Sequence, residues 1–128
     1  MNFKNLMIIK SLVSLGFGIL MLAIPDILLS IFGANLNDGG MFTAREYGAA
    51  LLGNACLCWI ARNSIESTAV KAIIVALFVY DLVGCVMTAL TVIYGILNPL
   101  GWLIVFIYLF FTVGFGYFLI KPVSEQEG

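Results

Sequence analysis

Apolar residues fill this chain in four long runs that are separated by short polar links. A helix of about 20 mostly apolar residues is long enough to cross the hydrocarbon core of a bilayer. We therefore predict membrane spans over about residues 6–24, 44–61, 66–94 and 100–120. Because short links force neighbouring helices to run antiparallel, we expect an all-α integral membrane protein. The predicted architecture is an antiparallel four-transmembrane-helix bundle with up-down-up-down order, in a single domain over residues 1–128.

The stretch after the first span is apolar but too short to cross a membrane. Pro25 ends or kinks the first helix, because proline lacks a backbone N–H and clashes with the preceding turn. Over about residues 26–32 we predict a short interfacial helix, whose apolar side chains enter the lipid while Asp26 stays in water. Gly33 and Gly95 each follow an apolar run, and we expect them to cap the helices that end there.

Three polar positions are expected to open the later spans. Thr43 and Glu46 have the spacing of a capping box at the start of the second span. Asn63 has the same relation to a glutamate three residues further on, and it predicts the start of the third span. Asn98 followed by Pro99 predicts the start of the last span, because asparagine caps helices and proline suits the first helical position.

The basic residues are unequally divided between the two predicted surfaces of the membrane. One surface has Arg45 alone, whereas the other has five basic residues, Lys4, Lys10, Arg62, Lys71 and Lys121. Cytoplasmic loops carry the excess of lysine and arginine. We therefore expect a multi-pass protein of the cell (inner) membrane with both termini in the cytoplasm.

Composition supports lipid as the main partner and excludes several functions. The 128 residues are 62% hydrophobic and 10% charged, whereas soluble domains carry about 25% charged residues. A formal net charge of −1 with no basic patch gives no basis for nucleic-acid binding. The absence of histidine removes bis-histidine haem, most zinc and copper sites and the usual general base. No nucleophile–base pair, metal cluster or phosphate loop is present in the sequence, so we expect no catalytic residue, metal or cofactor.

Asp81 is the residue with the clearest potential for chemistry, because it lies near the middle of the third predicted span. A carboxylate at the bilayer centre costs about 2.5–3.5 kcal/mol on insertion scales, so it should face other helices. Gly84, Cys85 and Thr88 follow at helical spacing and share its face. This face is small and polar, as a helix–helix contact or a binding site would require.

Polar residues of the other spans are expected to meet Asp81 in one core. Asn54 lies at a similar depth in the second span and is its predicted partner. Lys10 lies about two turns nearer the cytoplasmic surface. Its stem is long enough to pair with Asp81, but we expect the side chain to snorkel to that surface instead. In a structural interpretation, the contact between Asp81 and Asn54 fixes helix register. In a functional one, Asp81 is the ionisable group of a ligand-binding or proton-linked site with Asn54, Lys10, Thr88 and Tyr108 as the other candidates.

Short apolar motifs along most of the chain resemble uncharacterised small bacterial four-helix membrane proteins related to the DoxX-like family. The motifs are Arg45-x-x-Gly48, Leu51-Leu52-Gly53, Trp59-x-Ala61-Arg62 and Gly101-Trp102. The resemblance implies a four-helix membrane bundle. It also implies an oxidoreductase subunit, although no active residue of that family has a matching position in this chain.

Three functions follow from these observations. The first is a binding or accessory subunit, which we do not expect to be an enzyme. Its partner would be a lipid-like or apolar molecule such as a quinone, or another membrane protein. The second is a proton-coupled transporter that works as an oligomer around Asp81. The third is a membrane oxidoreductase subunit that uses Cys56, Cys58 or Cys85, which we otherwise interpret as reduced thiols that pack as small apolar residues.

Overall fold

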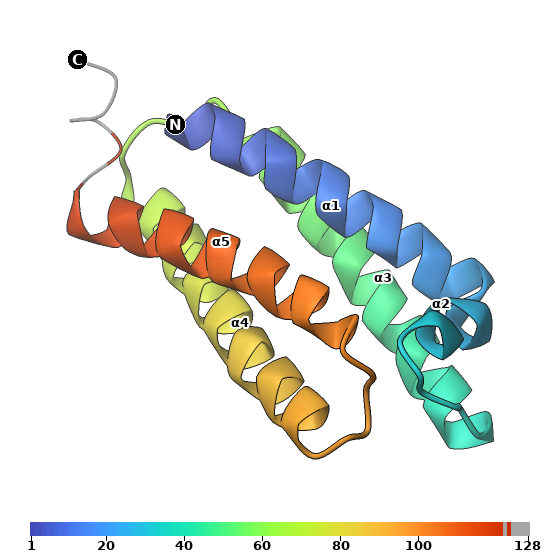
Figure 1. The fold of residues 1–128 in the computed structure, drawn as a ribbon. Coiled ribbons are helices and arrows are strands. Elements are labelled where there is room, and N and C mark those ends of the chain that lie inside the picture. The colour runs from blue at the N-terminus through green and yellow to red at the C-terminus, as the bar shows by residue number, and fades with distance from the viewer. Residues whose placement is uncertain (122, 124–128) are drawn as a thin grey trace.

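The structure is a computed structural model that describes residues 1–121 and residue 123. Within these residues the chain is all-helical, with five helices and no strand (Figure 1). The helices are α1 (Phe3–Ala23), α2 (Pro25–Ile31), α3 (Asp38–Ala61), α4 (Thr68–Ile93) and α5 (Gly101–Ile120). By length and composition α1, α4 and α5 could each cross a membrane, whereas α3 does not belong to that set. The helical class is therefore as predicted, and three apolar helices indicate a membrane protein.

The long helices form two antiparallel hairpins, α1 with α3 and α4 with α5. The N-terminus, the link between α3 and α4, and the last turn of α5 lie at one end of the molecule, which we call the termini end (Figure 1). Helix α2 and the link between α4 and α5 lie at the opposite end, the α2 end. In α1 and α3 two glycines allow the backbones to approach, since a Cβ on Gly48 would lie 3.0 Å from the carbonyl oxygen of Gly18.

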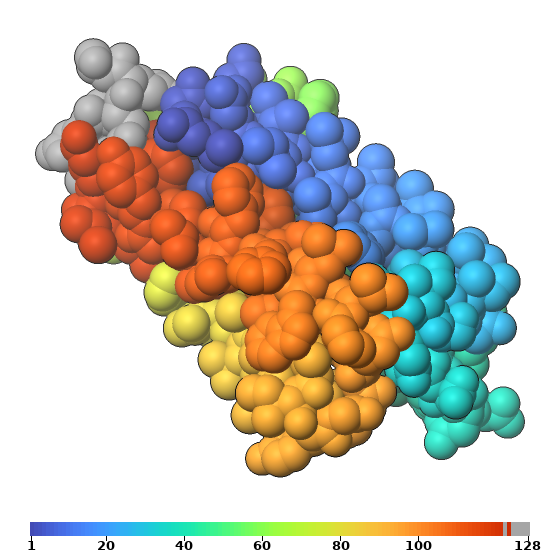
Figure 2. All heavy atoms as spheres, in the orientation of Figure 1, coloured from blue at the N-terminus to red at the C-terminus, as the bar shows by residue number. Residues whose placement is uncertain are grey.

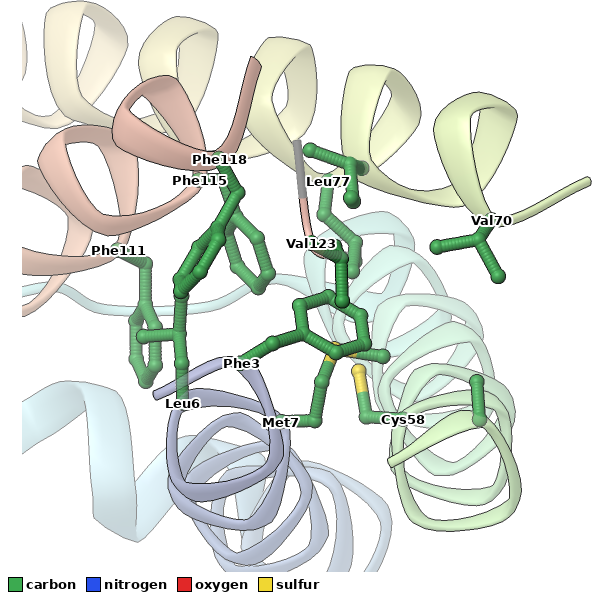
Figure 3. Close-up of a cluster of buried hydrophobic side chains, with 12 residues drawn as sticks. Phe3, Leu6, Met7, Cys58, Val70, Leu77, Phe111, Phe115, Phe118 and Val123 are labelled. Carbon is green, nitrogen blue, oxygen red and sulfur yellow. The ribbon is translucent and has the colours of Figure 1, made fainter. Parts of the chain in front are cut away.

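A buried apolar core near the termini end holds the two hairpins together (Figure 3). Phe3 of α1 meets Phe118 of α5 edge to face, with 5.5 Å between the ring centroids. Cys58 contributes from α3 and Leu77 from α4, so all four long helices enter this core. The hairpins are thus fixed to each other at one end by ordinary hydrophobic burial.

Helices α3 and α4 begin at residues of the polar loops and not at the predicted capping boxes. Asn37 caps α3, because its side-chain oxygen accepts from the Gly40 N–H at 2.7 Å. Ser67 caps α4 in the same way. The predicted caps Thr43 and Asn63 are therefore wrong. A helix extends back to the first side chain that can accept from its unpaired N–H groups, and Asn37 lies six residues before the predicted cap Thr43.

Asn98 has a different role from the one predicted. Helix α5 begins at Gly101, and no side chain caps it. The Asn98 side-chain oxygen accepts from the Leu100 N–H at 3.0 Å, while the side-chain N–H₂ reaches across to α2. The residue therefore links two elements instead of opening one helix.

The predicted helix ends are confirmed. Helix α1 stops at Ala23 and α2 begins at Pro25, so the break at this proline is present. Gly33 and Gly95 follow α2 and α4 with φ of +84° and +78°. Only glycine adopts this left-handed conformation without strain, which explains its place after a helix.

Candidate functional site

A buried ion pair lies between the two hairpins. Lys10 Nζ of α1 donates to Asp81 Oδ1 of α4 at 2.5 Å, and the two side chains are 4% and 0% exposed. The predicted partner of Asp81, Asn54, is therefore wrong, and so is the expectation that Lys10 snorkels to the surface. A charge in a low-dielectric interior is attracted to an opposite charge much more strongly than to an amide, and the lysine stem is long enough to reach it.

Aromatic rings surround the ammonium group of this pair. Lys10 Nζ lies 4.8 Å from the centroid of the Tyr80 ring and 4.5 Å from that of Phe111. Both distances are within the range of a cation–π contact. The other oxygen of the carboxylate, Asp81 Oδ2, is buried and has no hydrogen-bond partner among the described residues. The pair thus satisfies one carboxylate oxygen and leaves the other free to accept.

Three tyrosine hydroxyls meet beside the ion pair. Tyr47 of α3 shares hydrogen bonds with Tyr80 of α4 and with Tyr108 of α5, the latter at 2.6 Å. Tyr108 can pack closely against α4 because Gly84 has no side chain there: a Cβ on Gly84 would lie 2.6 Å from Tyr108 Cε1. The hydroxyl cluster therefore connects one helix of the first hairpin to both helices of the second.

A cavity of about 210 Å³ extends from the ion pair toward the α2 end. Its polar lining residues include Lys10, Ser14, Asp81, Thr88 and the three tyrosines of the hydroxyl cluster. The rest of its wall is largely apolar, with Leu28 of α2 and Leu97 of the α4–α5 link at the far end. An apolar cavity of about 150 Å³ is enough to hold benzene, so this one has room for a molecule of one ring or a short apolar chain.

The link between α4 and α5 contacts α2 beside this cavity. The Asn98 side-chain N–H₂ donates to the carbonyl of Ile31 at 2.9 Å, and its backbone N–H donates to the carbonyl of Phe32 at 2.7 Å. Figure 2 shows the link and α2 packed against each other at this end of the molecule. The two hairpins are thus joined again beyond the cavity.

The cavity brings together four of the five candidate residues from the sequence, namely Lys10, Asp81, Thr88 and Tyr108. Asn54 is half-buried on α3 and is not among the residues that line the cavity. The sequence pattern does not identify Tyr80 as a site residue, because Tyr80 is not on the face of α4 that carries Asp81 and Thr88. Its signal is its place directly before an intramembrane acid, where a long side chain can also reach the interior.

The three cysteines are free. Cys58 is buried in the apolar core, Cys85 is half-buried with Sγ 3.9 Å from the Val105 carbonyl oxygen, and Cys56 is exposed. Their places suit packing residues better than a dithiol centre.

Comparison with known proteins gives a family and no closer relative. Neither a search of curated proteins nor a search of solved structures gives a match. The profile of one family matches residues 2–126, which is nearly the whole chain. The chain therefore belongs to the DUF8292 family, whose description is a domain of unknown function.

Proposed function

We propose that this protein is a membrane protein that binds a small, largely apolar molecule between its two helical hairpins, as a binding or accessory subunit. One observation carries the proposal: the cavity has walls from both hairpins, an apolar body, and one polar end formed by Lys10 and Asp81. Ligand sites are typically apolar hollows with a few well-placed polar groups. Intramembrane ionisable residues that face a cavity commonly belong to such sites.

The proposal includes α3 as a fourth span in an antiparallel four-helix bundle. Helix α3 packs along α1, and its charged residues Arg45 and Glu46 lie near the α2 end, where both are exposed. Trp59 and Trp102 lie toward opposite ends of the molecule with 46% and 40% of their surface exposed. Tryptophan favours the membrane–water interface, so the two residues are suitable markers for its two surfaces.

The proposed orientation has both termini in the cytoplasm of a cell whose inner membrane holds the protein. Since Lys10 is buried in its ion pair, it no longer counts as a surface charge. The termini end still has four basic residues, Lys4, Arg62, Lys71 and Lys121. Arg45 is near the other end, where its Nε–H donates to the Leu22 carbonyl at 3.3 Å. The asymmetry of basic residues therefore still favours cytoplasmic termini.

A second candidate function is proton-coupled transport. The observation that favours it is that Asp81, which can carry a proton, both lines the cavity and joins the hairpins through Lys10. Protonation of Asp81 would weaken its ion pair with Lys10 and so change the contact between the two hairpins. Uptake into proteoliposomes that depends on a pH gradient, and that Asp81→Asn abolishes, would support this function over simple binding.

The DoxX-like resemblance suggests a third proposal, a membrane oxidoreductase subunit. The three cysteines, all of which lie among the described residues, are free and offer no paired thiols for it. Binding is therefore the function that the geometry supports best.

Native mass spectrometry of the protein released from a mild detergent tests the proposal. We expect a retained small molecule on the wild-type protein, and the same spectrum gives the oligomeric state. Thr88→Phe places a ring in the cavity and should remove the bound mass. Met87→Phe, at the neighbouring and 56% exposed position, adds the same ring outside the cavity and should retain it. A spectrum with no bound mass, or with equal retention in both variants, would contradict the proposal.

A further inference from the structure

The free oxygen of Asp81 indicates what kind of ligand the cavity accepts. The Asp81 side chain is fully buried, lines the cavity, and has Oδ2 without a hydrogen-bond partner among the described residues. Buried polar atoms are nearly always hydrogen-bonded, and an ionised acceptor is among the most costly to leave unpaired. The site therefore lacks one donor, and a bound molecule can supply it.

The charge of the site favours a neutral molecule. Lys10 compensates the charge of Asp81 at 2.5 Å, so a second full charge in the cavity would have no counter-ion. A carboxylate would face the free oxygen of Asp81, and an ammonium group would face Lys10. A charge without a partner in a low-dielectric interior is strongly unfavourable. The donor that fits is therefore an uncharged group, and among uncharged donors an O–H group makes the shortest hydrogen bonds to a carboxylate oxygen.

The shape and walls of the cavity favour a single ring. Its volume of about 210 Å³ is somewhat larger than the ~150 Å³ that holds benzene. Aromatic side chains form much of its wall, namely Phe17, Phe32, Tyr47, Tyr80, Tyr108 and Phe111. Aromatic rings pack well against each other in edge-to-face or offset geometry.

We propose that the ligand of this cavity is a neutral single-ring phenol whose hydroxyl donates to Asp81 Oδ2 while its ring packs among the aromatic side chains. This inference rests on the proposed binding function and adds the chemical class of the ligand. It also assigns Asp81 as the residue that reads the hydroxyl group, with Lys10 as its positioning residue.

A matched pair of probes tests the inference on the intact protein in detergent. 4-Methylphenol and 1,4-dimethylbenzene have nearly the same shape, and only the first has an O–H group. Equilibrium dialysis against empty micelles of the same detergent gives the protein-bound fraction, with each affinity referred to the probe concentration in the micelle. We expect 4-methylphenol to bind at least about tenfold more tightly, since a hydrogen bond to a charged group is worth at least that factor.

Two variants separate the role of Asp81 from that of the cavity. Asp81→Asn keeps an oxygen for Lys10 but presents N–H donors to the cavity, so the tenfold preference should disappear and binding of the acceptor 4-methylacetophenone should increase. Lys10→Met combined with Asp81→Leu removes the pair altogether and should bind both original probes equally. This double variant is expected to fold even where Asp81→Asn does not, because apolar replacement of a buried ion pair is often neutral.

The outcomes separate the two proposals. Equal binding of the two probes to the wild-type protein, as expected if a water molecule satisfies Oδ2, overturns the phenol inference and leaves the binding function in place. Binding of neither probe beyond empty micelles overturns both. A preference for 4-methylphenol that persists in the double variant shows that another group reads the hydroxyl and overturns the role of Asp81. A preference that the wild-type protein shows and the double variant loses supports the inference.

Discussion

Lys10 of α1 and Asp81 of α4, 71 positions apart in the chain, form the buried ion pair that joins the two helical hairpins. The hairpins also meet in the apolar core at the termini end and through Asn98 near the α2 end. The ion pair lies between these two contacts, at the inner end of the cavity. The same ion pair therefore contributes to the stability of the fold and to the cavity site.

Removing one partner of the pair should cost much more than removing both. Lys10→Met leaves the Asp81 carboxylate buried without its cation, and breaking a buried pair typically costs about 3–5 kcal/mol. The double variant with Lys10→Met and Asp81→Leu should unfold at or near the wild-type temperature. Thermal unfolding in a mild detergent measures both, and Lys4→Met at an exposed position is the control.

A double-mutant cycle on the same variants measures the coupling. We expect a coupling free energy of several kcal/mol between the two positions. Additive losses, with the double variant less stable than either single variant, would show that the pair does not form in the folded protein.

Gly84→Ala should disrupt the tyrosine cluster. The new Cβ would lie 2.6 Å from Tyr108 Cε1, so the ring must move and its hydrogen bond to Tyr47 should be lost. Overpacking of this kind typically costs about 1–3 kcal/mol. Gly53→Ala is the matched control, since nothing lies within 4 Å of a Cβ there. If chemical unfolding finds the two variants equally stable, the close contact of Tyr108 with α4 is wrong.

Asn98→Ala should loosen α2 without unfolding the protein. It removes two side-chain hydrogen bonds, to the Ile31 carbonyl and from the Leu100 N–H, but keeps the backbone bond to the Phe32 carbonyl, so the expected loss is about 1–3 kcal/mol. Hydrogen exchange should become faster over residues 25–33 and stay unchanged in α4. The exposed Asn35→Ala provides the comparison. Unchanged exchange over residues 25–33 would argue against this tie between the link and α2.

The cysteines should differ in reactivity and matter little for folding. A lipid-soluble maleimide should label the exposed Cys56 and leave the core residue Cys58 unlabelled in the folded protein. Replacement of Cys56, Cys58 and Cys85 by alanine should give a folded, monodisperse protein with a small loss from the core position. Aggregation of the triple variant, or fast labelling of Cys58, would contradict their role as packing residues.

The helices could be predicted from the sequence because each depends on local properties. Apolar runs identify the long helices, Pro25 identifies the break after α1, and Gly33 and Gly95 identify two helix ends. The starts of α3 and α4 were misplaced because several polar residues in each link could act as a cap. Asn37 and Ser67 have the backbone conformation that the role requires, and conformation is set by the whole link.

The site could be predicted only in part, because its contacts depend on how helices cross. Counting residues from each helix start places Asn54 and Asp81 at the same depth in the membrane and so predicts that they are partners. Such a count assumes that neighbouring helices are parallel. Packing brings the Lys10 stem to Asp81 instead and turns Tyr80 toward Tyr47 of the other hairpin. Residue type and position in the spans identify most of the site residues, whereas the pairs that they form can be seen only in the three-dimensional structure.

Photolabelling in native-like membranes tests the binding site most directly. A small aromatic diazirine, applied to the protein in vesicles and mapped by mass spectrometry, should label cavity residues such as Leu51 and Ile104. That labelling should be saturable, should be displaced by excess 4-methylphenol, and should be lost in Thr88→Phe but not in Met87→Phe. Labelling confined to lipid-facing positions such as Val113, growing in proportion to probe concentration and equal in both variants, would contradict a ligand site between the hairpins.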